Sequence, residues 1–448
     1  MASTYLTQSG TAGGSTTKFT KSFWIKRSGL ATPVNYIFDN SGVAEVLAQF
    51  DSNDKFIFAI FDSGTYSTEL QSTQVFRDCS GWYNFVIAVD YTNVTQAHRA
   101  RVYVNGIEIT AWDIETRPSN TTTTFDTWNS SKTLYIGSTS SGTNNFDGIM
   151  SYVIHVDGTQ YAPTVFGETD TDTGEWKIIT SPSITYGTKG FLILKNGNTI
   201  TDQSTNSNDW TLGGGTLTDT KDCPDNVFAT LNSLDNYYAG GTFANGNNTV
   251  TTINTGYTYN TSTFGVATGK WYWECKWSAQ PTGSSDQVQI GIAKRPAPSS
   301  TTWLGQQLYT YGYQGSSGHV QNNNVNASGS VATPYSVGDI ISVAMDLDNN
   351  KIHFAKNGAW TNSSDPAANS GGVTITAPDS TPEDSGVYFA AFGDANNSLQ
   401  ETGQFNFGNG FFGTSAVTSA GTAGSTPGTF EYDVPSGYEP LTTKGLNA

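Results

Sequence analysis

Residues 270–276 alternate bulky and polar side chains, a pattern typical of a strand that packs against a core on one face. Residues 340–347 form a second apolar run of strand length. Asn357-Gly358 can adopt positive φ at both central positions of a tight turn, so the pair predicts a hairpin whose first arm is residues 351–354. Because the chain shows no sustained helical period, the pattern predicts an all-β fold.

The first half of the chain alternates in the same way, in short runs. Residues 55–61 place Phe56, Phe58 and Ile60 on one face of an expected strand. A strand at residues 82–90 precedes a hairpin that turns at Asn105-Gly106. Other expected strands are residues 19–26, 36–39, 46–51, 134–137, 146–150 and 152–157. At 448 residues the chain is too long for one sandwich, so we predict two antiparallel β-sandwiches in tandem.

Six motifs follow one another in the second half, at residues 271–275, 290–293, 338–341, 346–358, 405–408 and 435–441. They include Trp271-Tyr272-Trp273-Glu274-Cys275 and Pro435-Ser436-Gly437-Tyr438-Glu439-Pro440-Leu441. In this order they closely resemble the SPRY domain, a bent β-sandwich. The resemblance implies a recognition scaffold without chemistry of its own, which binds peptides or other ligands through loops at one end of the sandwich.

The first half carries a Trp-Tyr strand at residues 82–90, a Tyr-Val-Asn-Gly hairpin at residues 103–106, an Ile-Gly strand at residues 136–137 and a Phe-Asp-Gly strand at residues 146–148. This series resembles the concanavalin A-like, laminin G-type jelly roll over roughly residues 5–194. We therefore expect the jelly roll at residues 1–200 and the SPRY-like domain at residues 225–448. The polar residues 201–224, with Gly213-Gly214-Gly215, are expected to form an ordered crossing or linker between them.

Residues 167–176 and 206–210 resemble the spacer that follows jelly rolls of this type in marine bacteriophage proteins. That resemblance implies a surface protein of a tailed-phage virion, made in the host cytoplasm. The N-terminus has no basic stretch followed by an apolar core, so we expect no signal peptide, and release by lysis would explain a lectin-like protein without one.

The net charge and the cysteines exclude several classes of partner and of site. The net charge of −17 and only 21 Lys and Arg residues disfavour nucleic acid and anionic membrane surfaces as partners. No apolar run approaches the ~20 residues of a membrane span, so no membrane insertion is expected. The distant Cys79, Cys223 and Cys275 suggest neither a disulfide framework nor a zinc site.

Catalytic patterns are missing from the sequence. Jelly-roll glucanases carry two carboxylates on one strand, and the nearest run, Glu431-Tyr432-Asp433, lies in the other domain. No serine has glycine both two residues before and two residues after it, so there is no nucleophile elbow. We therefore expect a protein without enzymatic activity.

Calcium is the one metal that the loops suggest. Some laminin G-type domains hold calcium between loop carboxylates and backbone carbonyls, and the candidate ligands here are Asp51, Asp54, Asp62 and Asp147. No Asp-x-Asp-x-Asp-Gly loop supports them, and Asp147 can simply accept backbone hydrogen bonds at a turn. We therefore expect no cofactor, with calcium as the less favoured alternative.

Aromatic residues are the main candidates for binding, because their flat rings suit the apolar faces of sugars. The candidate ligand-binding residues are Trp303, Tyr309, Tyr311, Tyr313 and His319 in the second half, and Trp112 and Trp128 in the first. The alternative for the three tyrosines is that their spacing of two places them on one face of a core strand. Packing is likewise the alternative for His319.

These observations lead to one main expectation and two others. We expect a non-enzymatic virion surface protein, a capsid or tail appendage for decoration or host adhesion, with other virion proteins and a host surface glycan as partners and a homo-oligomeric state. A SPRY-type adaptor that binds a peptide is the alternative. A polysaccharide-degrading enzyme would need the missing pair of acids.

Overall fold

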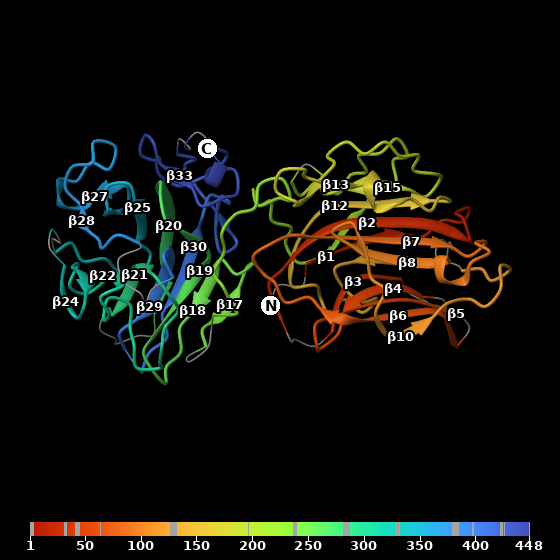
Figure 1. The fold of residues 1–448 in the computed structure, drawn as a ribbon, viewed down its shortest axis with the longest axis horizontal. Helices are drawn as coiled ribbons and strands as arrows, with labels where there is room; N and C mark the ends of the chain where they lie inside the picture. Colours follow the sequence, from red (N-terminus) through yellow and green to blue (C-terminus); the bar gives the residue numbers. More distant parts are fainter. Residues whose placement is uncertain are drawn as a thin grey trace. The chain divides into compact units, whose positions relative to one another are not determined.

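The computed structural model describes residues 4–30, 34–40, 45–62, 64–125, 132–195, 197–235, 240–280, 287–327, 329, 332–378, 385–396, 398–421, 424 and 426–447. The chain divides into two compact units, Met1–Asp219 (unit 1) and Thr220–Ala448 (unit 2). Figure 1 shows that both are built from strands. Within the described residues there is no α-helix, only short 3-10 turns, so the all-β prediction of two tandem sandwiches is confirmed.

Unit 1 has two large antiparallel sheets within its described residues. The eight-stranded sheet has the order β10 (Trp112–Thr116), β6 (Thr65–Val75), β5 (Lys55–Asp62), β4 (Glu45–Phe50), β3 (Asn35–Asn40), β11 (Thr133–Ile136), β1 (Tyr5–Ser9) and β16 (Thr211–Gly214). The six-stranded sheet has the order β15 (Phe191–Ile193), β12 (Gly148–Asp157), β2 (Lys18–Arg27), β7 (Tyr83–Asp90), β8 (Ala100–Val104) and β9 (Ile107–Glu108). The smaller elements are β13 (Gly167–Thr169), β14 (Trp176–Ile178), η1 (Gln96–His98) and η2 (Pro163–Val165).

The core of unit 1 lies between these two sheets. Strand β5 turns Phe56, Phe58 and Ile60 inward, and β2 turns Phe23 and Ile25 toward them from the other sheet. Side chains on a strand alternate between faces, so the even-numbered residues of β2 face away from this core. Burial of each such apolar side chain contributes about 1.5–3 kcal/mol.

A second apolar layer covers the outer face of the six-stranded sheet. Val86 and Ile154 point outward from β7 and β12 and pack against Phe166 and its neighbours. Figure 1 shows the segment that carries β13 on the far side of this sheet from β3 and β4. The Trp176 ring lies against Gly106, where an added Cβ would come within 2.4 Å of it, and its indole N–H donates to Asn84 Oδ1 at 3.1 Å. This face of the sheet is therefore closed by the chain itself.

The structure differs from the expected linker at residues 201–224. Trp210 is buried in the core of unit 1 at 5% exposure. Strand β16 pairs with β1, with Leu6 opposite Leu212. A buried tryptophan and a sheet pairing need fixed geometry, so residues 201–219 are an ordered part of unit 1 rather than a linker between the domains. The domain bounds of 1–200 and 225–448 themselves stay a prediction.

Unit 2 is also built on two large sheets within its described residues. The nine-stranded sheet contains β17 (Thr242–Ala244), β18 (Thr249–Thr251), β30 (Thr402–Asn406), β20 (Lys270–Ala279), β25 (Ile340–Asp346), β26 (Lys351–Lys356) and β27 (Ala359–Trp360) in that order, with β28 (Val373–Thr374) on β26 and β33 (Glu439–Pro440) on β20. The six-stranded sheet has the order β19 (Thr258–Val266), β29 (Tyr388–Asp394), β21 (Val288–Ala293), β22 (Thr310–Gln314), β23 (Val320–Asn322) and β24 (Val325–Asn326). The remaining elements are β31 (Phe411–Phe412), β32 (Ser415–Ala416), η3 (Thr361–Ser363) and η4 (Gly445–Asn447).

Strand β20 shows how the core of unit 2 is filled. Its odd-numbered residues, among them Trp273, Cys275 and Trp277, lie in the main core. On its other face Glu274 is fully buried and accepts hydrogen bonds from the backbone N–H groups of Glu431 and Tyr432, both at 2.9 Å. The carboxylate of Glu274 thereby fixes the segment that leads into β33.

The two ends of each unit meet. In unit 1 the hydroxyl of Thr4 donates to the backbone oxygen of Thr216 at 2.9 Å, next to the β1–β16 pairing. In unit 2 the backbone N–H of Ala229 donates to the Leu441 oxygen at 2.9 Å, and Phe228 forms an isolated antiparallel β-bridge with Thr442. In each unit, the first and the last described segments thus contact each other.

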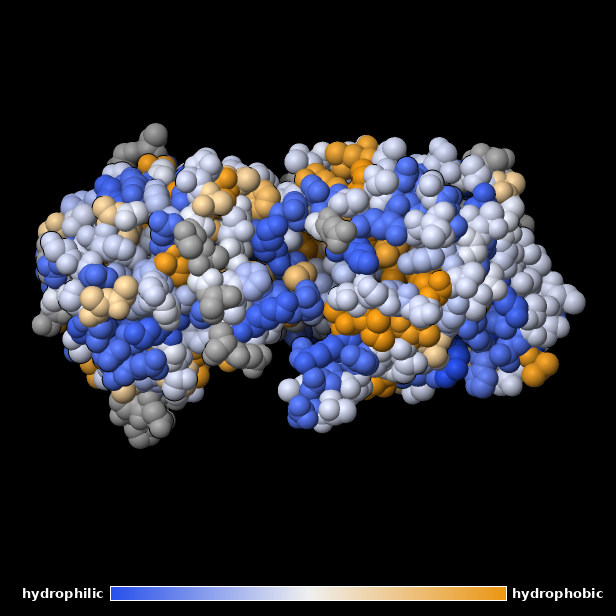
Figure 2. Space-filling model, turned by 90° about the horizontal axis from the view of Figure 1, so that it is seen from above, coloured by the Kyte–Doolittle hydropathy of each residue, from blue (hydrophilic) through white to orange (hydrophobic). Residues whose placement is uncertain are grey.

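Because the hydrophobic residues fill the cores, little apolar surface remains, and the cysteines form no cross-links. Figure 2 shows a largely polar face with apolar residues in small groups. Cys79, Cys223 and Cys275 form no disulfide. Among the described residues, no helix has the length and apolar character that crossing a membrane requires.

Candidate functional site

The loop between β21 and β22, residues 294–309, is the part of unit 2 that presents aromatic side chains. Its two ends are joined where the Lys294 N–H donates to the Tyr309 oxygen at 3.1 Å. Leu304 is fully buried and anchors the middle of the loop under Tyr259. The side-chain amide of Asn322 donates to the backbone oxygens of Leu308 and Thr310, both at 2.9 Å. The loop is therefore held at both ends and in the middle.

Five residues on and beside this loop, Tyr257, Arg295, Trp303, Leu308 and Tyr309, form what we call the aromatic loop surface. Trp303 lies edge-on to Tyr257, with ring centroids 5.3 Å apart. The Arg295 guanidinium lies over the Tyr309 ring at 4.2 Å and donates to its hydroxyl at 2.5 Å. Because each ring has a partner, the rings are held in place before any ligand arrives.

Amide side chains and a turn border the aromatic loop surface. The N–H of Asn323 donates to the Gln307 oxygen at 3.3 Å, and the N–H of Asn324 donates to the Gly305 oxygen at 3.0 Å. Both asparagines have positive φ, 51° and 63°, a conformation that asparagine tolerates better than most residues. Leu308 and Val325 are 51% and 62% exposed. The site thus combines flat rings, exposed apolar groups and amide donors and acceptors.

Two of the predicted binding tyrosines are core residues. Tyr311 and Tyr313 are 4% and 1% exposed and lie in the main core of unit 2. Their hydroxyls are used inside the fold, since Tyr313 donates to the Thr333 oxygen at 2.5 Å and Tyr311 bonds the Thr376 hydroxyl at 2.9 Å. The prediction that they bind a ligand is therefore wrong, and the alternative of a strand face holds.

His319 lies at the other end of β22 from Tyr309. It follows a turn in which the Gln314 N–H donates to the His319 oxygen at 2.9 Å. The rise of ~3.3 Å per strand residue puts Gln314 roughly 13 Å from Thr310. Trp303 and Tyr309 thus lie on one loop before β22, and His319 lies beyond the other end of that strand.

The first-half candidates do not form a comparable site. Trp112 begins the edge strand β10, packs half-buried against the core, and lies 6.0 Å from the Arg117 guanidinium. Trp128 lies outside the described residues. A binding role for either tryptophan stays a prediction.

The calcium candidates are engaged in other interactions. Asp54 is buried and each of its carboxylate oxygens pairs with an arginine, Arg27 and Arg77, both at 2.9 Å. Asp51 accepts from the N–H of Lys55 in its own turn at 2.9 Å. Burial raises the pKa of Asp147. The side chain of Asp62 lies outside the described part, and no group of three or more metal-ligating side chains occurs among the described residues.

Sequence reasoning did not find three residues of the aromatic loop surface. Tyr257 and Leu308 stand in polar stretches without a pattern, and only the fold brings Tyr257 next to Trp303. Arg295 follows Lys294 directly after a buried strand, and this isolated pair of basic residues was the only sequence feature that could have pointed to Arg295 as a surface residue. Lys294 itself points inward and donates to the Ala377 oxygen at 2.7 Å, so only Arg295 of this pair belongs to the aromatic loop surface.

Two family models match the chain, one in each unit. The model for the concanavalin A-like lectin/glucanases superfamily matches residues 2–157, and the SPRY domain model matches residues 270–410. None of the curated proteins compared matches the chain.

Solved structures of both kinds of domain are similar to parts of the chain. The SPRY domain of human HERC1 is 16% identical over 39% of this chain and 96% of its own, with a TM-score of 0.30. A heptameric SAP-like pentraxin from Limulus polyphemus is 13% identical over 35% of this chain and 71% of its own, with a TM-score of 0.26. A human SPRY domain is 15% identical over 35% and 90%, with a TM-score of 0.24. At these scores the assignment rests on the family models and the sheets: the chain carries a concanavalin A-like domain followed by a SPRY domain.

Proposed function

We propose that this protein is a non-enzymatic recognition protein that binds carbohydrate through the aromatic loop surface. The observation that carries the proposal is that one loop presents a half-buried Trp303 packed on Tyr257, a Tyr309 held by Arg295 and an exposed Leu308, with exposed asparagines beside it. Sugar rings stack their apolar faces on aromatic rings, and their hydroxyls hydrogen-bond to amides and to arginine. Rings that are already fixed lose little conformational entropy when a ligand binds.

Peptide binding is the second candidate, and one feature favours it. Strand β24 is the edge of the six-stranded sheet, and Val325 on it is 62% exposed. An edge strand offers unpaired backbone groups to an extended peptide, which would add as a further strand. Such a peptide would lie on β24 rather than on the rings, so replacement of Trp303 would affect it little.

The absence of enzymatic activity is supported by the sequence, which has neither the paired acids of a glucanase nor a nucleophile elbow. Incubation with bacterial surface polysaccharides should release no reducing ends. Reproducible turnover that disappears when one acidic residue is replaced would contradict this part of the proposal.

We extend the proposal to location: the protein works on the surface of a tailed-phage virion, as a homo-oligomeric capsid or tail appendage. The support is the resemblance of residues 167–176 and 206–210 to the spacer of marine bacteriophage proteins. Antibodies against the purified protein should label intact particles, and light scattering should give a mass that is a multiple of 47.9 kDa. Unlabelled particles would contradict the location.

The central test replaces Trp303 by Ala in the full chain. We expect binding to surface polysaccharide, measured by calorimetry or on a glycan array, to weaken by at least about tenfold, which corresponds to about 1.4 kcal/mol. Trp360→Ala is the matched control, because Trp360 is also half-buried in unit 2 but lies on β27 in the other sheet. If the Trp303 variant binds like the wild type, the aromatic loop surface is not the binding site.

A further inference from the structure

The core of unit 1 contains a lysine. Lys21 lies on β2 between Phe19 and Phe23, in the row of side chains that faces the eight-stranded sheet. In the sheet it stands opposite Ile87 on one neighbouring strand and His155 on the other. Its exposure is 7%. A charged side chain in such a position is costly unless something of opposite charge accompanies it.

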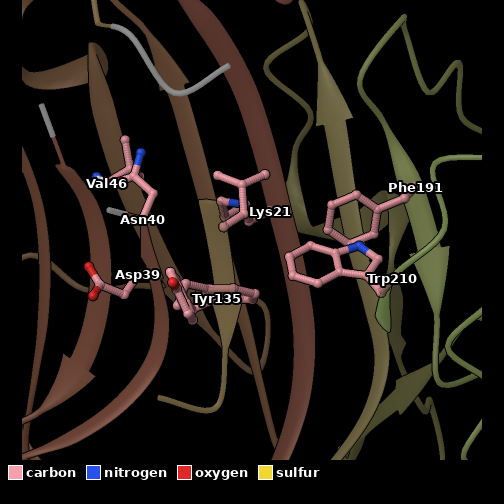
Figure 3. Close-up of a pocket in the computed structure, with 9 residues that line it drawn as sticks. Lys21, Asp39, Asn40, Val46, Tyr135, Phe191 and Trp210 are labelled. Atoms are coloured by element: carbon pink, nitrogen blue, oxygen red, sulfur yellow. Dashed lines mark hydrogen bonds between the residues drawn. The ribbon is translucent and has the colours of Figure 1, made fainter. Parts of the chain in front are cut away.

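A small cavity adjoins Lys21, and Figure 3 shows its lining. The cavity has a volume of about 10 Å³, which is room for about one occupant of the size of a water molecule. Its lining includes Lys21, Phe38, Asp39, Asn40, Phe191 and Trp210. It therefore lies between the two sheets, where Trp210 closes the core.

Two hydrogen-bond donors border the cavity without a partner among the described residues. Lys21 forms neither a hydrogen bond nor an ion pair there, and its ammonium lies 4.8 Å from the centre of the Phe38 ring. Asn40 is 1% exposed, and its Nδ2 is buried without an acceptor. The orientation of this amide is set by Val46, whose backbone N–H donates to Asn40 Oδ1 at 2.7 Å. Because a backbone N–H can only donate, the atom that faces Val46 must be Oδ1, and Nδ2 is the atom that has no hydrogen-bond partner in the described part of the chain.

The charged and titratable neighbours do not balance Lys21. The Asp39 carboxylate accepts from the Ser140 N–H at 2.8 Å, and Figure 3 shows it turned away from Lys21. His155 is fully buried, and burial together with Lys21 lowers its pKa well below the usual value, so it stays neutral. The cavity lining thus has one cation, one amide donor and one carboxylate, and the carboxylate of Asp39 is turned away from the cation.

We propose that this cavity binds one small inorganic anion of the halide class, held by Lys21 Nζ and Asn40 Nδ2. Chloride accepts hydrogen bonds from both groups and balances the ammonium. Burial alone lowers the pKa of Lys21 to about 7, and a bound anion would raise it again. The anion would join β2 of one sheet to β3 of the other, so it would act as a stabilising part of the core rather than as a substrate.

The first test measures the melting temperature of unit 1 in the full chain at pH 6 and constant ionic strength. Sodium chloride and sodium bromide are compared with sodium gluconate, whose anion is too large for the cavity. The wild type should melt about 5 °C higher in chloride once its concentration is 100-fold above the dissociation constant. Lys21→Met, which has a similar length and no charge, should melt at the same temperature in all three salts. An equal response of the wild type and the variant would overturn the proposal.

The second test needs only the wild type and decides the matter even if the variant does not fold. Crystals grown with sodium bromide should show an anomalous peak between Lys21 Nζ and Asn40 Nδ2. Density without anomalous signal at that place would show that water is the occupant, and the proposal would be wrong.

Discussion

Glu274 provides the sharpest test of how unit 2 is held together. Its Oε1 accepts from the Tyr272 hydroxyl at 3.0 Å and from the Tyr432 N–H at 2.9 Å. Its Oε2 accepts from Asn406 Nδ2 at 3.2 Å and from the Glu431 N–H at 2.9 Å. Four donors thus converge on one carboxylate that is fully buried.

Replacement of Glu274 by Gln keeps the shape but removes one of the two acceptor oxygens. The new amide N–H₂ faces two donors, so two buried donors lose their partner, at about 1–3 kcal/mol each. Part of this loss is offset because a neutral amide is cheaper to bury than a carboxylate, and we expect a net loss of about 3 kcal/mol. For a unit of this size that corresponds to a melting temperature roughly 6–12 °C lower.

The same substitution changes the pH dependence. Burial raises the pKa of Glu274 from 4.5 to about 7, although the four donors oppose the shift. Between these values the folded state holds a proton that the unfolded state has lost, so stability falls as the pH rises from 4.5 to 7. This contribution, on the order of 3 kcal/mol, should be missing in the Glu274→Gln variant.

Differential scanning calorimetry of the full chain at several pH values measures both effects, with a fragment of residues 220–448 to identify the transition of unit 2. Asp348→Asn is the control, because Asp348 is exposed and its one bond, from the Gly269 N–H at 2.8 Å, can be kept by an asparagine oxygen. A Glu274→Gln variant that melts within about 2 °C of the wild type would refute the idea that this carboxylate fixes the segment leading into β33.

The remaining predictions concern unit 1. Asp54→Asn should cost about 3 kcal/mol in urea unfolding, because Arg27 stays buried without its counter-charge while asparagine tolerates the φ of 64°; a loss under 1 kcal/mol would contradict this. In halide-free buffer, the lowered pKa of Lys21 means that the unfolded state binds more protons between pH 7 and 10.5. Stability should therefore rise over this range by up to about 5 kcal/mol, and a Lys21→Met variant should lack the rise. A fragment of residues 1–219 should melt well above a fragment of residues 1–200, since the shorter one lacks Trp210, worth about 3–5 kcal/mol; equal melting temperatures by circular dichroism would show that Trp210 is dispensable.

Local signals predicted much of the fold. The hairpins at Asn105-Gly106 and Asn357-Gly358 both form, with φ of 47° and 79° in the first pair and 50° and 79° in the second. Such turns depend on two residues only, so the sequence is enough to find them. The alternating runs likewise predicted strands, because the period of a strand is visible in its own residues.

The positions that depend on a distant partner were not predictable. Tyr311 and Tyr313 alternate in the same way whether their face meets a core or solvent, and only the opposite sheet decides that they are buried. Trp210 stands alone in a polar stretch, so no period signals its burial. A lysine is normally expected at the surface, so Lys21 was not predicted to be buried. Its neighbours on the same strand face, Phe19 and Phe23, indicate that this face of β2 points into the core.

The meeting of the two ends within each unit has a consequence for synthesis on the ribosome. Strand β1 is made long before its partner β16, which ends at residue 214, so the edge of the eight-stranded sheet stays open until almost the whole unit has been made. At ~5–20 residues per second this interval lasts roughly 10–40 s. In unit 2, residues 227–229 likewise cannot pair with residues 441–443 until that segment has been synthesised. Joining the two ends of a unit and opening the chain at a surface turn elsewhere should therefore give a circularly permuted protein that shortens this wait without changing the core.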